Sequence, residues 1–315
     1  MRRILPELRG AVARLRVLHA AATARMSGTL RGILYVAGAG VSFALLDSLA
    51  KALCRIYPSE MVVWARYFFH VLVMLVILWP AWRGRLVATR SPGLQVLRGL
   101  ALGMSSVTFF AALALMPQAE ATAINAIGPI IVTVVAVLWL GERAPPGTWY
   151  ALSASFVGVL LIIRPGSSVF SPAALLPLLT AGFGAAYTLL TRRLAGIDNS
   201  VATLFIGALV PTVLLCGLMP FYWKTPEAWW HWIGLVSLGA IGAGGHLLVV
   251  RAYETASASA LAPFSYTHAV AAIPMGFLVF GTFPDRPALL GMLLIVATGV
   301  VMALLRGNEA GRLPK

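Results

Sequence analysis

The sequence predicts an all-α, polytopic membrane protein with ten transmembrane helices arranged as two inverted repeats of five. Composition and an internal repeat carry this prediction. Of the 315 residues, 60% are hydrophobic and only 11% are charged, whereas charged residues make up about a quarter of a soluble domain. At about 20 residues for each spanning helix, ten spans use nearly all of the chain. No room is left for a large extramembrane enzyme domain.

Hydrophobic runs between helix-breaking residues place the spans along the chain. In the second half the runs are bounded by Pro172, Asp198, Lys224 to Glu227, Arg251 to Glu254 and Pro284 to Pro287. The third and fourth runs are separated only by Pro117 and Gln118, and no long loop separates the eighth from the ninth. We expect spans near residues 32–53, 60–80, 94–116, 119–140, 148–163, 173–191, 199–222, 228–250, 256–281 and 286–305.

Both ends of the chain are expected to lie outside the bilayer. Residues 1–29 carry several Arg among Ala and Leu with one acidic residue, Glu7, and the Arg interrupt the apolar core that a secretory signal needs. We expect a basic cytoplasmic extension there and a short cytoplasmic tail at 307–315. Met26 directly precedes the first span, so translation starting at Met26 is an equally good interpretation.

The Lys and Arg gather on one side of this ten-span arrangement, which receives both termini. The other side receives few of them, including Arg164 and Lys224. Because Lys and Arg concentrate in cytoplasmic loops, both termini are expected in the cytoplasm, with Arg98, Arg192 and Arg193 as anchors at the membrane surface. The net charge of +14 is thus explained by topology. No basic run interleaved with aromatic residues indicates nucleic-acid binding.

The internal repeat relates the two halves of the chain. Residues 114–129 and 252–266 are both Ala-rich openings to a span with a nearby proline, and residues 150–164 parallel residues 291–306. Self-similarity of this kind indicates a repeat architecture. Each unit has five spans, and because five is odd, the two units must cross the bilayer in opposite directions.

The two units are expected at 30–165 and 173–306. Inverted repeats are typical of alternating-access transporters, whose substrate lies near the bilayer midplane between the units. A channel would instead need a charged or carbonyl-lined ring through both units, and the sequence offers no obvious one. Cys54 and Cys216 stand singly in apolar surroundings, so they indicate neither a disulfide framework nor a metal site.

Several segments resemble the EamA family of the drug/metabolite transporter superfamily. They are Arg98, Phe109, Ala121, Ile124, Pro129, LGER at 140–143 and GVLLIIRP at 158–165. Asp47 with Lys51, WAR at 64–66, PFSY at 263–266 and LVFG at 278–281 are similar to a subgroup with S-adenosylmethionine, riboflavin and opine-metallophore carriers. The resemblance covers about residues 30–306. The second half departs from it, with Gly281, Thr282 and Phe283 in place of LGER.

The resemblance implies a secondary transporter of the bacterial inner membrane, monomeric or homodimeric. It favours export of a small amino-acid-like or opine-metallophore-like metabolite, with import of a riboflavin-like or S-adenosylmethionine-like compound as the alternative. A sensor or scaffold that binds a ligand without moving it is a third hypothesis, which the inverted repeat disfavours. No enzyme is expected because the sequence lacks HExxH, a GxSxG triad and a Walker phosphate loop. No cofactor or metal is implied.

Ionisable residues inside the predicted spans are the first candidates for the substrate site, because each is costly in a bilayer unless paired or hydrated. Asp47 and Lys51 stand four residues apart and could pair on one helix face. Arg66 is expected at the same depth in the second span. An anionic group of the substrate could displace Asp47 from either cation, and a permanent structural ion pair is the alternative.

The intramembrane histidines are candidates for proton coupling, together with Asp47. His268 in the ninth span and His246 in the eighth can titrate near neutral pH, and neither has a carboxylate at helical spacing. His70 lies one turn beyond Arg66 and shares its face. Packing without a functional role is the alternative for each histidine.

Three further residues complete the predicted substrate site. Asn125 and Tyr266 lie on repeat-equivalent spans close to prolines, where freed backbone carbonyls can line a polar cavity. Phe110 is a candidate aromatic wall for a planar substrate. A helix–helix hydrogen bond for Asn125 and simple packing for Phe110 are the alternatives.

Overall fold

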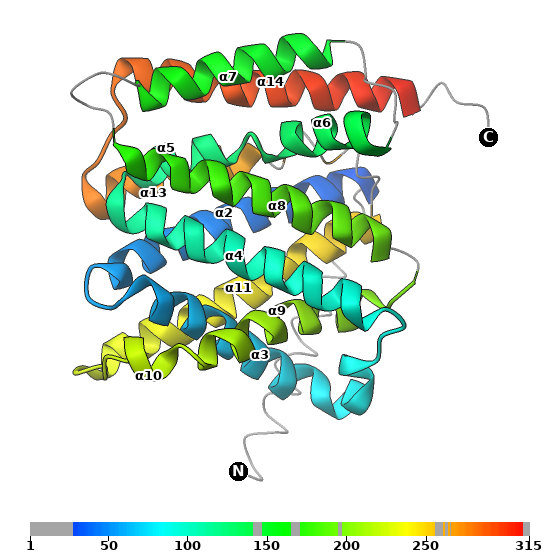
Figure 1. The fold of residues 1–315 in the computed structure, drawn as a ribbon, viewed down its shortest axis with the longest axis vertical. Coiled ribbons are helices and arrows are strands. Elements are labelled where there is room, and N and C mark those ends of the chain that lie inside the picture. Colours follow the sequence, from blue (N-terminus) through cyan, green and yellow to red (C-terminus); the bar gives the residue numbers. More distant parts are fainter. Residues whose placement is uncertain are drawn as a thin grey trace.

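The computed structural model describes residues 28–140, 147–164, 171–194, 197–255, 261, 264 and 266–310, and this part of the chain contains helices and no β-strand. Most helices run roughly parallel or antiparallel to one another in one bundle (Figure 1). The expected N-terminal extension up to residue 27 and the end of the C-terminal tail lie outside the described residues.

The helices follow the predicted hydrophobic runs. Those of the first half are α2 (Gly28–Cys54), α3 (Ser59–Trp82), α4 (Pro92–Leu115), α5 (Gln118–Asn125), α6 (Gly128–Leu140) and α7 (Thr148–Ile163). Those of the second half are α8 (Leu175–Leu194), α9 (Ser200–Cys216), α10 (Met219–Tyr222), α11 (Trp229–Thr255), α13 (Thr267–Phe280) and α14 (Arg286–Ala310). Short 3-10 helices, η1 (Arg83–Val87) and η2 (Pro172–Ala174), precede α4 and α8.

Helix length and composition agree with a multi-pass membrane protein. Five stretches in the described residues are long and apolar enough to cross a bilayer: Leu30–Cys54, Ser59–Trp79, Pro92–Leu115, Pro172–Thr191 and Trp229–Ala252. The outer surface also carries large apolar side chains, such as Val76 at 71% and Leu278 at 74% exposure. A continuous apolar surface of this kind is suited to lipid rather than water.

Two of the predicted spans are not continuous helices. The fourth, expected over 119–140, is divided into α5 and α6, with a turn in which the Ile127 N–H donates to the Ile124 carbonyl. Pro129 follows directly, has no N–H to donate and disfavours a helical conformation in the residue before it. The seventh, expected over 199–222, is divided between α9 and α10. Of the ninth, expected over 256–281, the helix α13 covers Thr267–Phe280, and residues 256–260, 262, 263 and 265 lie outside the described residues.

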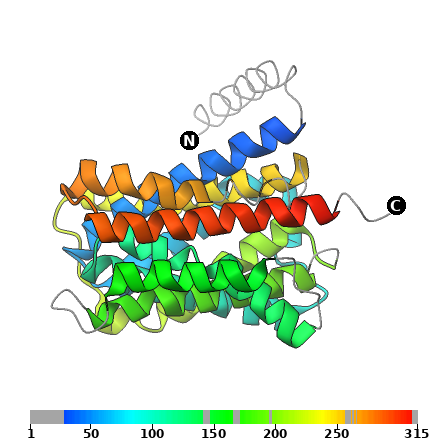
Figure 2. The same cartoon turned by 90° about the horizontal axis from the view of Figure 1, so that it is seen from above.

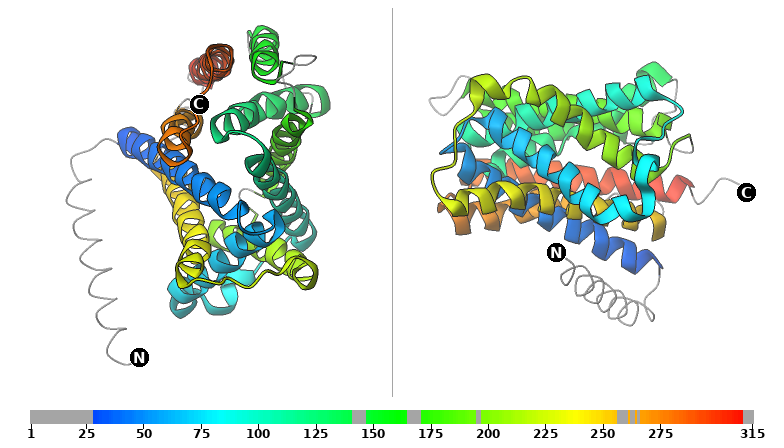
Figure 3. Two further views of the ribbon diagram at one scale, coloured as in Figure 1. Left: turned by 90° about the vertical axis from the view of Figure 1, so that its left-hand side faces the viewer. Right: turned by 90° about the horizontal axis from the view of Figure 1, so that it is seen from below.

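The largest helix interfaces join helices of opposite halves, namely α2 with α11, α4 with α8 and α7 with α14. Exchanging the halves converts the first of these pairs into the second and leaves the third unchanged. Figures 1 and 2 both show α7 and α14 side by side, and the left view of Figure 3 places them together at one edge of the bundle. The halves are therefore packed into each other along their whole length.

A glycine pair holds α7 against α14. A Cβ on Gly158 would lie 2.8 Å from the Gly291 carbonyl oxygen, so only a hydrogen at this position permits the close approach of the backbones. Next to it, the hydroxyls of Ser155 and Thr298 are hydrogen-bonded at 2.6 Å.

Candidate functional site

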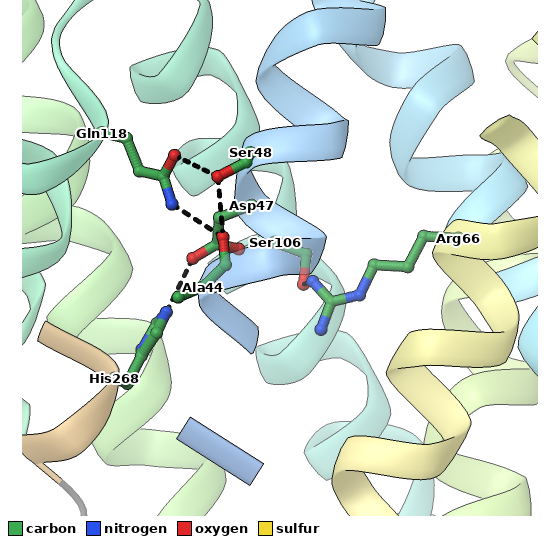
Figure 4. A network of polar contacts seen from close by, with 7 residues as sticks. All are labelled: Ala44, Asp47, Ser48, Arg66, Ser106, Gln118 and His268. Atoms are coloured by element: carbon green, nitrogen blue, oxygen red, sulfur yellow. Dashed lines mark hydrogen bonds and ion pairs between the residues drawn. The ribbon is translucent and has the colours of Figure 1, made fainter. Parts of the chain in front are cut away.

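A hydrogen-bonded aspartate–histidine pair inside the bundle joins the two halves. The Asp47 carboxylate on α2 lies 2.7 Å from His268 Nε2 near the start of α13, and the side chains are 5% and 23% exposed (Figure 4). The helices approach closely here, since a Cβ on Gly40 would be 2.8 Å from the His268 backbone nitrogen. The sequence analysis predicted both residues as site candidates and missed their pairing.

The same turn of α2 is also bound to α5 (Figure 4). Ser48 Oγ donates to Gln118 Oε1 at 2.8 Å, and Gln118 Nε2 donates to the Ala44 carbonyl at 2.8 Å. Gln118 is fully buried. Neither Ser48 nor Gln118 was predicted as a site residue. The position of Gln118, an amide side chain directly after Pro117 at the start of an apolar span, could have indicated it. Together these bonds fix the carboxylate of Asp47 between α5 and α13.

Lys51 does not pair with Asp47, and the expected ion pair four residues apart is wrong. Its Nζ donates to the carbonyls of Leu113 and Met116, each at 2.6 Å, and lies 5.5 Å from the centre of the Phe280 ring. These carbonyls stand at the C-terminal end of α4, where unsatisfied oxygens and the helix dipole favour a cation. Lys51 therefore caps α4 from the neighbouring helix α2.

Arg66 also stands apart from Asp47, so the predicted three-member network is not formed. Its Nη1 donates to Ser106 Oγ on α4 at 3.1 Å, and its guanidinium lies 5.3 Å from the ring centre of Tyr67 and 5.5 Å from that of Phe110. In Figure 4, Arg66 points toward Ser106 while Asp47 points toward His268. In the described part of the chain, no carboxylate lies within ion-pair distance of Arg66, and its Nε is buried without a hydrogen-bond partner.

The other two candidate histidines lie between these groups. The His70 and His246 rings are 5.7 Å apart, centre to centre, and Phe43 lies 5.1 Å from His246 and 6.1 Å from His268. Within the described residues, neither His70 nor His246 makes a hydrogen bond. The rings thus form a row from His268, past Phe43 and His246, to His70.

The remaining predicted site residues lie nearby but have different degrees of burial. Phe110 is fully buried behind Arg66, so in this conformation it supports the guanidinium and presents no wall to a substrate. Asn125 ends α5 at the break and is half-buried. Tyr266 is 6% exposed and directly precedes α13.

Arg98 is not a surface anchor, as the sequence suggested, but a buried bridge between the halves. It is 2% exposed. Its guanidinium donates to the Thr191 hydroxyl at 2.8 Å, the Tyr187 hydroxyl at 2.7 Å and the Thr203 carbonyl at 2.9 Å. Gly207 makes room for it, because a Cβ there would be 2.7 Å from Arg98 Nη1. Neutral oxygens from α8 and α9 therefore satisfy this cation.

Asp198, between α8 and α9, connects segments of the two halves through hydrogen bonds. Its carboxylate accepts hydrogen bonds from the Arg90 backbone N–H at 2.7 Å, from Gln95 Nε2 at 2.8 Å and from the Thr89 hydroxyl. Burial raises the pKa of Asp198, but these hydrogen bonds outweigh it and hold the pKa below its usual value. The cluster ties the α3–α4 connection to the second half.

A second contact between the halves matches this cluster. Tyr57, between α2 and α3, is hydrogen-bonded through its hydroxyl to His231 Nδ1 on α11 at 2.6 Å. Lys224 donates to the Ile56 carbonyl at 3.0 Å. Exchanging the halves relates this contact to the Asp198 cluster, since each joins the loop after the first helix of one half to the segment before the third helix of the other.

A multi-pass helical bundle whose halves enclose a buried polar site has the architecture of a membrane transporter. The chain belongs to the EamA-like transporter family, which matches residues 30–164 and again residues 171–305. The family resemblance is thereby confirmed, as is the expectation of a membrane transporter rather than an enzyme.

Known transporters are similar over most of the chain. A riboflavin transporter of Vibrio cholerae is 28% identical over 271 residues, covering 85% of this chain and 91% of its own length. An S-adenosylmethionine uptake transporter of Rickettsia conorii is 27% identical, covering 82% and 87%. A pseudopaline exporter of Pseudomonas aeruginosa is 26% identical, covering 86% and 95%.

The fold also matches a solved structure. A protein crystal structure with 19% sequence identity superimposes with a TM-score of 0.62, covering 89% of this chain and 98% of the other. At that identity the match shows the fold alone.

Proposed function

We propose that the protein is a secondary transporter that moves a small organic metabolite across the bacterial inner membrane by alternating access. Its ten spans form two inverted units, at 30–165 and 173–306, with both termini in the cytoplasm. The interfaces that interchange when the halves are exchanged support this arrangement. In such transporters the substrate binds between the units, which rock around it.

The Asp47–His268 pair is the observation that carries the mechanism. A carboxylate and an imidazole buried in an apolar bundle are costly unless they are paired, and this pair connects a helix of one unit to a helix of the other. Protonation of Asp47 removes its charge and weakens the connection between α2 and α13. The proton therefore serves as the coupling ion, with His246 and His70 extending the row of titratable groups toward Arg66.

The predicted site residues are assigned to substrate binding in this mechanism. Asp47 and Arg66 supply opposite charges, while Asn125 and Tyr266 supply polar groups close to the break in α5–α6 and the start of α13. Lys51 and Phe110 act indirectly, because Lys51 caps α4 and Phe110 supports Arg66.

Export is the proposed direction, as for the pseudopaline exporter. Import of a vitamin or nucleoside-like compound is the second candidate, favoured by the similarity to the riboflavin and S-adenosylmethionine transporters. Nothing in the comparisons supports a sensor or scaffold that does not transport.

Metabolite profiling tests both transport and direction. A deletion strain and the same strain carrying the wild-type gene are compared, in cells and in spent medium, under several nutrient conditions. Export predicts a compound that builds up inside the deletion strain and is depleted from its medium. A compound left unconsumed in the medium would reverse the direction, and identical profiles would overturn the proposed function.

A further inference from the structure

We infer that the protein recognises an anionic group of its substrate, a carboxylate or a phosphate, with Arg66 and His70 of α3 and His246 of α11, beside Gly242. The inference rests on the proposed transport function and names the substrate class.

Arg66 differs from Arg98 and Lys51 in the number of hydrogen-bond donors that it leaves unused. Arg98 donates to three oxygens, and Lys51 caps the end of α4 with two short hydrogen bonds. Arg66 is 9% exposed and donates one hydrogen bond, to Ser106, of the five that a guanidinium can make. A buried charge with few partners is costly. An anion supplied by the substrate offsets that cost.

The two histidines present further hydrogen-bonding atoms at the same place. His70 is four residues after Arg66, so both side chains lie on one face of α3. His246 reaches the His70 ring from α11, at 5.7 Å between ring centres. A neutral imidazole has one donor and one acceptor nitrogen, and no hydrogen bond occupies those of His70 or His246 within the described residues. Each can therefore turn a donor toward an anion held by Arg66.

Gly242 on α11 faces this cluster without a side chain. A Cβ at Gly242 would lie 3.7 Å from His70 Nδ1, 3.9 Å from Arg66 Nε and 3.3 Å from Leu46 Cδ1. A methyl group there would press on Leu46 and lie in contact with both polar groups, next to their unused donors. Gly244, two residues along the same helix, has nothing within 4 Å of such a Cβ. It offers a matched control.

This chemistry separates the substrates named for the relatives. S-adenosylmethionine carries an amino-acid carboxylate, whereas riboflavin has neither a carboxylate nor a phosphate. The carboxylate of S-adenosylmethionine would give the free donors of Arg66 a negatively charged partner. Riboflavin offers no such partner. The inference therefore assigns an anionic metabolite to this chain, whichever way it is moved.

The test uses the full-length protein in the deletion strain, with wild type, Arg66→Lys, Gly242→Ala and Gly244→Ala expressed to equal membrane levels. The compounds that depend on the wild-type protein are identified by profiling, and their rates of movement are then measured for each variant. We expect these compounds to carry a carboxylate or a phosphate. Arg66→Lys keeps the charge but loses the planar fork and should slow transport about tenfold or more. Gly242→Ala should raise KM several-fold, and Gly244→Ala should behave as wild type.

The possible failures are distinguishable. A transported compound without an anionic group would overturn the inference and leave the transport function intact. The inference would also be overturned if the Arg66→Lys and Gly242→Ala variants both transported an anionic compound at the wild-type rate. If no compound depends on the wild-type protein, the proposed function itself fails and the inference falls with it.

Discussion

Asp47 and His268 are 221 positions apart in sequence, and their side chains are hydrogen-bonded at 2.7 Å between α2 and α13. The pair lies next to the Gln118 and Ser48 hydrogen bonds, so α2, α5 and α13 meet around one carboxylate (Figure 4). Ionisable groups on α2 and on the helices packed against it include Lys51 on α2, His246 on α11 and Glu120 on α5. Any movement of one half against the other must pull on this connection.

Asp47→Asn should abolish the dependence of transport on a pH gradient, because an amide cannot exchange a proton with His268. We expect the initial rate under a gradient to fall about a hundredfold or more, which is the lower end of the range for losing a proton-transferring side chain. The measurement is transport of the identified metabolite at several external pH values. Equal pH dependence in Asp47→Asn and wild type would exclude Asp47 as the coupling residue.

Arg98→Ala should strongly destabilise the protein. It removes the donor for three oxygens and leaves a cavity beside Gly207. Leaving a buried acceptor without its donor costs about 1–3 kcal/mol, and the cavity adds to that cost. Thermal unfolding of the detergent-purified protein measures it.

Arg251→Ala is the control for that measurement. Arg251 pairs with Glu254 on the surface, with the side chains 58% and 51% exposed, and exposed pairs contribute about 0–1 kcal/mol. Its melting temperature should stay close to that of the wild type. Equal losses in the two variants would show that Arg98 has no special structural role.

Gly158→Leu should separate α7 from α14. The new side chain would strike the backbone of Gly291 and the side chain of Ile295, and overpacking of this kind costs about 1–3 kcal/mol. Gly182→Leu on α8 is the control, because a Cβ there has nothing within 4 Å. The two variants are compared by melting temperature and membrane yield. A Gly158→Leu protein as stable as Gly182→Leu would contradict the observed packing of α7 on α14.

The Asp198 cluster should make stability depend on pH. Its hydrogen bonds hold the pKa of Asp198 below the unfolded value, so its stabilisation is present above the unfolded pKa and is lost as the pH falls through the folded pKa. Asp198→Asn should therefore melt below wild type near neutral pH. That difference should shrink as the pH falls from about 4, the usual pKa of an aspartate, to more acidic values. A difference that stays constant over this range would rule out the carboxylate charge as its source.

Much of the fold could be predicted from hydrophobic runs. Each long helix is apolar over its whole length, because its side chains either pack inside the bundle or face lipid. The break between α5 and α6 was missed, although Gly128 and Pro129 mark it. Apolar residues continue across it, and a count of hydrophobicity cannot detect a turn whose side chains remain apolar.

The candidate site could be predicted in its members but not in its pairs. Asp47, Arg66 and His268 stand out because a titratable group in an apolar run needs an explanation. Their partners come from other helices, so helical spacing led to Lys51 for Asp47, when the carboxylate binds His268. Lys51 instead donates hydrogen bonds to the carbonyls at the end of α4. This contact depends on how α2 packs against α4, so the sequence spacing alone could not predict it.

Transport by the purified protein in liposomes tests the central claim most directly, using the metabolite that profiling identifies and an imposed pH gradient. The account predicts that wild type accumulates the metabolite in response to the gradient, while Asp47→Asn, at equal protein content, does not. Movement no faster than in protein-free liposomes would contradict the claim that this chain is a transporter of that compound. Accumulation by wild type that ignores the gradient would contradict proton coupling.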